Sequence, residues 1–161
     1  MRMVRCLAVL AFCGLGVSGS AATQDFTFVG SFANVRQTSS DHCYGWSLEL
    51  WRYNGRLLGL LDRHQALCGD PPCQVLADIS HDRKSGRVSF SAFDMRFNGT
   101  LRSSEVSGTL GDERVRMKRT KDPGYDARPD KTLGTWCKFW VGVLRCQGVA
   151  DLCSSLGVVK Q

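Results

Sequence analysis

The sequence lacks the short motifs that mark several common catalytic and nucleotide-binding sites. It contains no G-x-S-x-G, H-E-x-x-H or C-x-x-C pattern and no glycine-rich phosphate loop. Histidine is scarce, with three in 161 residues. These absences argue against the enzyme classes that depend on those motifs, but they leave open a catalytic pair assembled from distant positions. We therefore expect a protein that is not an enzyme.

The sequence also lacks an apolar run of the roughly 20 residues that a transmembrane helix needs. The nearest candidate, Cys6–Val17, is uncharged but too short, and it follows Arg2 and Arg5. Small residues occupy positions 18–22. A basic start, a short apolar run and small residues form a secretory signal peptide. We predict a signal over residues 1–22, cleaved after Ala22 or one residue earlier, and a secreted or periplasmic protein.

A strong excess of one charge is missing too. Lysine and arginine number 21 against 15 acidic residues, a formal net charge of +6. The basic segment Arg114–Lys121 alternates with Val115 and Met117, as an ordinary strand would, and no aromatic stacking residues are interleaved with its charges. We expect no nucleic-acid partner. After signal removal, about 140 residues remain, enough for one domain.

The segment after the signal alternates between apolar and polar residues, with turns rich in Gly, Asn, Asp and Ser. Asn54-Gly55 is the strongest hairpin signal. Eight strands are predicted, at Phe26–Phe32, Trp46–Tyr53, Arg56–Arg63, Gln74–Ser80, Arg87–Phe93, Arg96–Arg102, Glu105–Leu110 and Arg114–Arg119. Short connections pair neighbouring strands, and closure removes exposed edges. The prediction is a mainly β fold, an eight-stranded antiparallel up-and-down barrel over residues 23–119.

The alternation also assigns the barrel interior. Trp46, Leu48 and Leu50 share one face, and the hairpin places Leu48 opposite Leu61 and Leu50 opposite Gly59. The other inward candidates are Phe28, Val88, Phe90, Phe97, Leu101, Val106, Leu110, Val115 and Met117. Because this set is large and apolar, we expect side chains to fill the interior, although a barrel of this size can instead hold one small ligand.

An apolar patch on the outside of the barrel needs cover from another part of the chain. It comprises Trp51, Tyr53, Leu58 and Leu60. A polar linker, residues 120–131, leads to a tail, residues 132–161. Apolar residues in this tail are spaced by three and four: Trp136, Phe139, Trp140, Val143 and Leu144. We predict a helix over about Leu133–Cys146, with Thr132 as N-cap and Gly148 as its stop, packed on the patch.

Six cysteines lie beyond the signal, and an even number in a small secreted chain predicts disulfides. They are Cys43, Cys68, Cys73, Cys137, Cys146 and Cys153. The spacings lack the paired C-x2-C knuckles of zinc sites, so we expect no metal or other cofactor.

Three of the cysteines lie in the barrel segment and three in the tail, so pairing all six needs an odd number of bridges between the two parts. Our first expectation pairs Cys68–Cys73 and Cys146–Cys153, which leaves Cys43–Cys137 to hold the tail. Cys43–Cys68 is an open alternative across the end of the hairpin, and it would send Cys73 to the tail.

Several segments together carry a family resemblance over about Asp25–Arg119. They are Phe28-Val29-Gly30, Trp46-Ser47-Leu48, Phe97-Asn98-Gly99-Thr100-Leu101 and Ser107-Gly108-Thr109-Leu110. Their pattern resembles small calycin-type barrels, the class of lipocalins and avidins, although Gly30-Ser31-Phe32 stands where lipocalins carry Gly-x-Trp. The chain is also similar to uncharacterised secreted bacterial proteins whose barrel ends in a Trp-containing helix, here Trp136–Cys146. Neither resemblance implies an activity.

The meander places the two longest loops, 33–45 and 64–73, at one end of the barrel. Function tends to lie on loops held by a rigid scaffold. The candidate binding residues there are Asp41, His42, His64, Gln65 and Asp70. His42 and His64, with Asp41 or Asp70, would form a metal-binding or acid–base set. Polar loop residues around a disulfide are the simpler interpretation.

The sequence favours a monomeric, non-enzymatic interaction module that binds another secreted or envelope protein through the loop-rich end. An inhibitor of a secreted hydrolase is one concrete version. The first alternative is a carrier of a small apolar ligand in the barrel interior. The second is an enzyme or metal site that uses the loop histidines.

Overall fold

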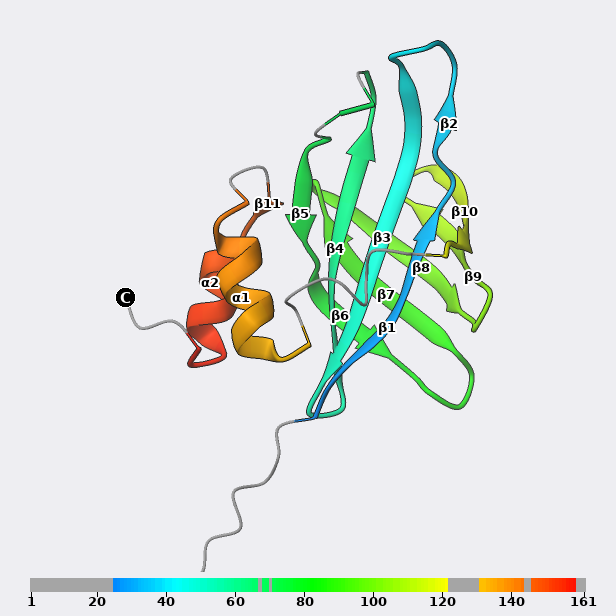
Figure 1. Cartoon of the computed structure of the whole chain (residues 1–161). Coiled ribbons are helices and arrows are strands. Elements are labelled where there is room, and N and C mark those ends of the chain that lie inside the picture. Colours follow the sequence, from blue (N-terminus) through cyan, green and yellow to red (C-terminus); the bar gives the residue numbers. More distant parts are fainter. Residues whose placement is uncertain (1–24, 67, 70, 122–130, 144–145, 159–161) are drawn as a thin grey trace, which may run out of the picture.

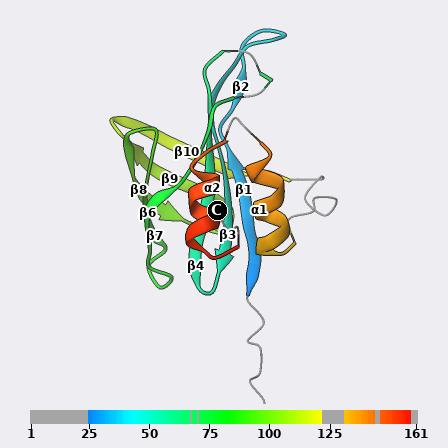
Figure 2. The ribbon, with the colours of Figure 1, turned by 90° about the vertical axis from the view of Figure 1, so that its left-hand side faces the viewer.

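The computed structural model describes residues 25–158, apart from 67, 70, 122–130 and 144–145. The predicted signal peptide, Leu144 and most of the predicted linker lie outside the described residues. Within them the protein is mainly β: one curled, half-barrel sheet with two short helices against one flank (Figures 1 and 2).

The described strands reproduce all the predicted β segments and add short ones. They are β1 (Phe26–Ala33), β2 (Arg36–Gln37), β3 (Cys43–Tyr53), β4 (Arg56–His64), β5 (Cys73–Val75), β6 (Ala77–His81), β7 (Arg87–Ala92), β8 (Met95–Leu101), β9 (Glu105–Leu110), β10 (Glu113–Arg119) and β11 (Cys146–Gln147). The helices are α1 (Leu133–Val141) and α2 (Val149–Ser155).

The strand order differs from the predicted closed eight-stranded barrel. Hydrogen bonding runs β11-β5-β4-β3-β1-β10-β9-β8-β7-β6, and β2 pairs with β3, so the described sheet has two ends. The predicted strand Gln74–Ser80 is divided at Leu76: β5 pairs with β4, whereas β6 pairs with β7. The register shifts between Ala77 and Ser80, and Asp78 has a φ of 49°. This bulge turns the segment from one neighbour to the other, and the sheet curls instead of closing.

The Asn54-Gly55 hairpin forms as predicted. Asn54 and Gly55 have φ values of 46° and 82°, the left-handed region that a tight two-residue turn requires. The turn pairs Leu48 with Leu61 and Leu50 with Gly59, as expected. It therefore sets which face of β3 and β4 points inwards.

The inner face of the sheet carries the larger apolar core. Its buried members are Phe32, Trp46, Leu48, Leu50, Leu57, Leu61, Leu76, Val88, Phe90, Ala92, Phe97, Val106, Leu110, Val115 and Met117. Leu101 packs against them while partly buried. The predicted inward set is thus confirmed, with one exception, Phe28.

Phe28 was expected inside but packs on the outer face, with its ring centroid 5.6 Å from that of Trp51. A bulge in β1 explains the difference. Phe28 pairs with Trp51 and Gly30 with Leu50, so Val29 is an extra residue. Because strand side chains alternate between faces, one extra residue sends Phe28 outwards and Phe32 inwards.

The outer core confirms the predicted covering of the apolar patch. Trp51, Tyr53, Leu58 and Leu60 are buried with residues of α1 and α2. Trp136 contributes most from α1: it is fully buried, with its ring 5.4 Å from that of Trp51. Both views show the helices against this flank of the sheet (Figures 1 and 2).

The boundaries of α1 are partly as predicted. Thr132 is the N-cap, and its hydroxyl accepts a hydrogen bond from the Thr135 amide in a capping box. The helix ends at Val141, however, with Gly142 as C-cap, and does not reach Cys146. Cys146 instead joins β11, which pairs in parallel with β5. Gly148, expected as the stop, is the left-handed N-cap of α2, with a φ of 80°.

The disulfides are Cys43–Cys68, Cys73–Cys146 and Cys137–Cys153. Our first pairing, Cys68–Cys73, Cys146–Cys153 and Cys43–Cys137, is therefore wrong. The alternative that joins Cys43 to Cys68 and sends Cys73 to the tail is confirmed, and a single bridge links sheet and tail.

Strand pairing and the course of the tail explain this connectivity. Pairing of β4 with β5 places Cys73 opposite Asp62, at the start of β5, and β11 brings Cys146 opposite Cys73. After β11 the chain enters α2, which packs against α1. The Cα atoms of Cys137 and Cys153 are then 5.8 Å apart, within reach of a bridge.

Candidate functional site

The loop-rich end of the sheet carries a projecting hairpin made by β2 and the start of β3 (Figure 1). Arg36 pairs with Tyr44 and Gln37 with Cys43. The Thr38 amide donates to the His42 carbonyl at 2.9 Å and closes the loop between the two strands. We call residues 36–44, together with Cys68, the disulfide tip.

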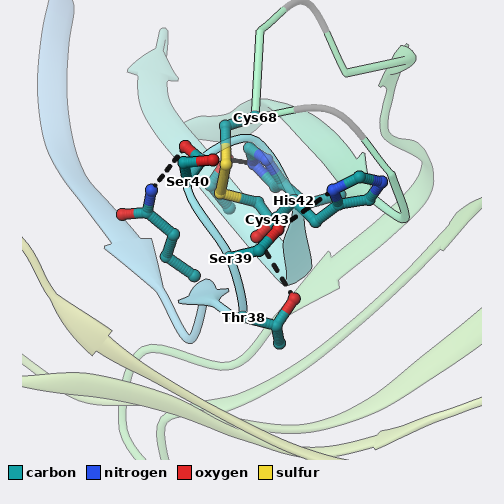
Figure 3. The surroundings of a disulfide bond; sticks show 9 residues. Thr38, Ser39, Ser40, His42, Cys43 and Cys68 are labelled. Carbon is teal, nitrogen blue, oxygen red and sulfur yellow. Dashed lines mark hydrogen bonds between the residues drawn. A yellow bond between two sulfur atoms is a disulfide. The ribbon is translucent and has the colours of Figure 1, made fainter.

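The tip is tied to the segment that follows β4. Besides the Cys43–Cys68 disulfide, the Cys43 amide donates to the Ala66 carbonyl at 2.7 Å, and the Cys68 amide donates to the Asp41 carbonyl at 2.8 Å. Figure 3 shows this disulfide with Thr38, Ser39, Ser40 and His42 around it. A covalent bond and two backbone hydrogen bonds therefore restrict the conformations open to an exposed loop.

The surface of the tip is polar, with one aromatic side chain. Residues 36–42 are exposed, and Tyr44 is 49% exposed. The segment from 36 to 44 holds arginine, glutamine, serine, threonine, aspartate, histidine and tyrosine, but no lysine or glutamate. Tyrosine and arginine are enriched at protein interfaces, whereas serine and aspartate, which this segment also contains, are depleted there along with lysine and glutamate.

The two loop histidines have different surroundings. His42 Nδ1 lies 3.1 Å from Ser39 Oγ within the tip, whereas His64 Nε2 lies 3.0 Å from Ser47 Oγ on the sheet. Asp41 contributes its carbonyl to the tip, and Asp70 lies outside the described residues. Within the part of the chain that the structure describes, no cluster of three or more His, Cys, Asp or Glu side chains is arranged to hold a metal ion.

Ser47 forms a cross-strand polar link that we did not predict. Its hydroxyl donates to Asp62 Oδ2 at 3.0 Å and also contacts His64. The Ser47 oxygen lies 3.0 Å from both Asp62 Oδ2 and His64 Nε2, so one hydroxyl bridges two side chains of β4. The link therefore suits a structural role between β3 and β4. The register of the Asn54-Gly55 hairpin, which places Ser47 opposite Asp62, was the signal that could have revealed it.

Gln65 belongs to a stack at the same end of the sheet. Its side-chain amide faces the Arg63 guanidinium, which lies 5.5 Å from the centre of the Trp46 ring. Trp46 is 5% exposed and directs its indole N–H at Glu113 Oε2, 3.4 Å away. This stack lies at the loop-rich end of the inner core. Gln65 therefore contacts the residue that packs on the core, although its own side chain is exposed.

The described helices include none that is long and apolar enough to cross a membrane. The three disulfides indicate an oxidising compartment, since thiols stay reduced in the cytosol of most organisms.

Comparison with protein-family models, with curated proteins and with solved structures found no match to this chain. The resemblance to calycin-type barrels therefore stays a prediction, and the function has to be argued from the chain itself.

Proposed function

We propose that this protein is a secreted, non-enzymatic interaction module that binds another secreted or envelope protein through the disulfide tip. An inhibitor of a secreted hydrolase is the most concrete version of this proposal. The main support for this proposal is that the Cys43–Cys68 disulfide and two flanking backbone hydrogen bonds restrain an exposed loop.

Preorganisation is the physical reason that such a loop suits binding. A flexible loop loses conformational entropy when a partner orders it, whereas a restrained loop has lost much of that entropy on folding. Inside the tip, the Gln37 side-chain amide adds a hydrogen bond to the Ser40 carbonyl at 2.8 Å. The exposed side chains then project from a backbone with few alternatives.

Tyr44 is our candidate for the anchor of the interface. It is the most exposed large hydrophobic residue in the described part of the chain, and it lies beside Arg36 in the β2–β3 pair. A tyrosine buries a large area at little entropic cost, because it has only two side-chain torsions. Interface energy is usually concentrated in a few such residues.

The inner core argues against the carrier alternative. The Phe90 and Phe97 rings stack with their centroids 4.7 Å apart, and both side chains are buried among the other core residues. An apolar ligand would have to displace these packed rings.

Photo-crosslinking tests the proposal. A photoreactive phenylalanine analogue replaces Tyr44 in the mature protein, which is then mixed with the secreted and envelope proteins of the native host. We expect one discrete adduct that excess wild-type protein suppresses. Phe139 on α1, 39% exposed, is the matched control position and should give no such adduct.

A second variant separates binding from chance labelling. Cys43→Ala with Cys68→Ala removes the restraint on the tip but leaves Tyr44 in place, so it should compete less well for the adduct. Equal labelling at positions 44 and 139, or no adduct at either, would refute the proposal. If the adduct partner is a hydrolase, its rate with and without the wild-type protein tests the inhibitor version.

We also propose that secretion uses the predicted signal, with cleavage after Ala22. The disulfides support export, and the amino-terminal sequence of the protein purified from its host tests the cleavage site. For the fold family, our proposal is a calycin-like sheet that curls without closing. It is supported by the β1–β10 pairing, which joins the first and last strands of the predicted meander.

A further inference from the structure

A hollow rich in arginine lies at the opposite end of the sheet from the disulfide tip. It has a volume of about 280 Å³ and is lined by Val29, Arg52, His81, Arg83, Gly86, Leu101, Arg102, Ser103 and Arg119. We call it the arginine hollow. Its cations come from strand ends and turns that are distant in sequence but meet at this end of the meander: near the end of β3, after β6, after β8 and at the end of β10.

Arg119 is the fixed member of the group. Its Nη2 donates to the Val29 carbonyl at 2.8 Å, and its Nε donates to the Ser103 carbonyl. The guanidinium carbon also lies 5.0 Å from the centre of the Phe32 ring. Gly30 makes this position possible, because a Cβ atom there would collide with the guanidinium. Two of the five N–H groups of Arg119 are thus hydrogen-bonded to backbone carbonyls of the described chain, and the residue also lines the hollow.

The lining contains no carboxylate. The acidic side chains nearest in sequence have other partners. Asp82 accepts hydrogen bonds from the Ser85 hydroxyl at 2.6 Å and from the Lys84 amide at 2.9 Å. Glu105 forms an ion pair with Arg116 at 2.7 Å. The lining itself therefore carries no compensating carboxylate, and the carboxylates that act on it, Asp82 on His81 and Asp25 on Arg52, lie outside it.

The electrostatics of two lining residues agree with this arrangement. Burial lowers the pKa of His81, and the charges of Arg52 and Arg83 lower it further against a smaller opposing effect of Asp82. Burial also lowers the pKa of Arg52, as does Arg83, while Asp25 opposes them. Arg52 and Arg83 thus lie close enough to repel each other, and a bound anion would relieve that repulsion.

We propose that the arginine hollow is a binding site for a phosphoryl or sulfate group. Arginine presents planar, bidentate donors that match such oxyanions. Four guanidinium groups offer more donors than the two oxygens of a carboxylate readily accept, whereas a tetrahedral oxyanion has more acceptors. The group is either a free ion or part of a larger molecule. This site is separate from the disulfide tip and does not depend on the function proposed for it.

A nuclear magnetic resonance titration of the mature protein tests the site. Inorganic phosphate, inorganic sulfate and glycerol 3-phosphate are added separately at constant ionic strength, with chloride as the reference. We expect saturable shifts confined to resonances of the lining residues, including His81 and Gly86. Tighter binding of the ester than of phosphate would identify a group carried on a larger molecule, and equal or weaker binding would identify the free ion.

Matched variants show whether the arginines are responsible. Arg83→Gln with Arg102→Gln changes two exposed lining residues, and we expect affinity to fall by about tenfold or more, as the loss of charge-assisted hydrogen bonds implies. Arg36→Gln with Arg114→Gln removes the same charge far from the hollow and should change affinity by less than about twofold. No saturable shift, or equal losses in the two double variants, would overturn the proposal.

Discussion

At the scale of single residues, His81 reports on the charge of the arginine hollow. Because burial, Arg52 and Arg83 all lower its pKa, we expect the imidazole to titrate below its ordinary value of about 6.5. Arg52→Gln should raise this pKa by removing one neighbouring charge. The measurement is a pH titration of the His81 ring by nuclear magnetic resonance.

The same pKa shift predicts how His81 affects stability. The unfolded chain takes up the proton at a higher pH than the folded protein, so protonation favours unfolding. The contribution of His81 is therefore present above about pH 6.5 and is lost as the pH falls through the folded pKa. As the control for the pH titration of the His81 ring, Arg114→Gln removes an arginine remote from the hollow and should leave the pKa of His81 unchanged. A midpoint at or above 6.5 in the wild type would contradict this interpretation.

At the scale of elements, Trp136 is a fully buried ring by which α1 packs on the sheet. This side chain is fully buried, with its ring 5.4 Å from Trp51 and 6.4 Å from Phe26. Trp136→Ala should lower the free energy of unfolding by about 3–5 kcal/mol, because it removes a large buried ring and leaves a cavity. Urea unfolding followed by circular dichroism measures the change.

Phe139 is the control on the same helix. It is 39% exposed, so Phe139→Ala should cost less than about 1 kcal/mol. Both substitutions have a similar effect on intrinsic helix propensity. The difference between their free energies of unfolding therefore measures how much the buried face of α1 contributes by packing on the sheet. Similar losses for the two variants would mean that α1 contributes little through its buried face.

At the scale of the whole molecule, the Cys73–Cys146 disulfide is the bridge that fastens the tail to the sheet beyond the linker. It spans 73 residues of sequence, against 16 for Cys137–Cys153. In the loop-entropy account, a longer loop gives greater stabilisation, so Cys73→Ala with Cys146→Ala should cost about 4 kcal/mol and the corresponding Cys137 and Cys153 variant about 3 kcal/mol. Denaturant unfolding gives both values.

Loss of the sheet–tail link has a second expected signature. Trp51 and Trp136 lie where the tail covers the sheet, so partial release of the tail should shift tryptophan fluorescence to longer wavelength at denaturant concentrations where β structure persists. Mass mapping of a non-reduced digest checks the connectivity directly. Recovery of a Cys68–Cys73 or Cys146–Cys153 peptide pair would contradict the structure.

The sequence by itself determined the positions of the strands, the main hairpin and the first cap of the tail helix. These features depend on neighbouring residues: the period-two alternation, the left-handed conformations that Asn54 and Gly55 tolerate, and the hydroxyl of Thr132. It also predicted that the apolar face of α1 covers Trp51 and its neighbours, because two exposed apolar faces in one chain need each other.

Only the tertiary structure decided the disulfide pairing, the side on which Phe28 lies, the open order of the sheet and the grouping of the arginines. Each depends on long-range geometry that local pattern does not encode. One bulged residue, Val29, reverses the face of Phe28, and one bulge after Leu76 changes the partner of a strand. Arg52, Arg83, Arg102 and Arg119 line one hollow because separated turns and strand ends come together at one end of a curled sheet.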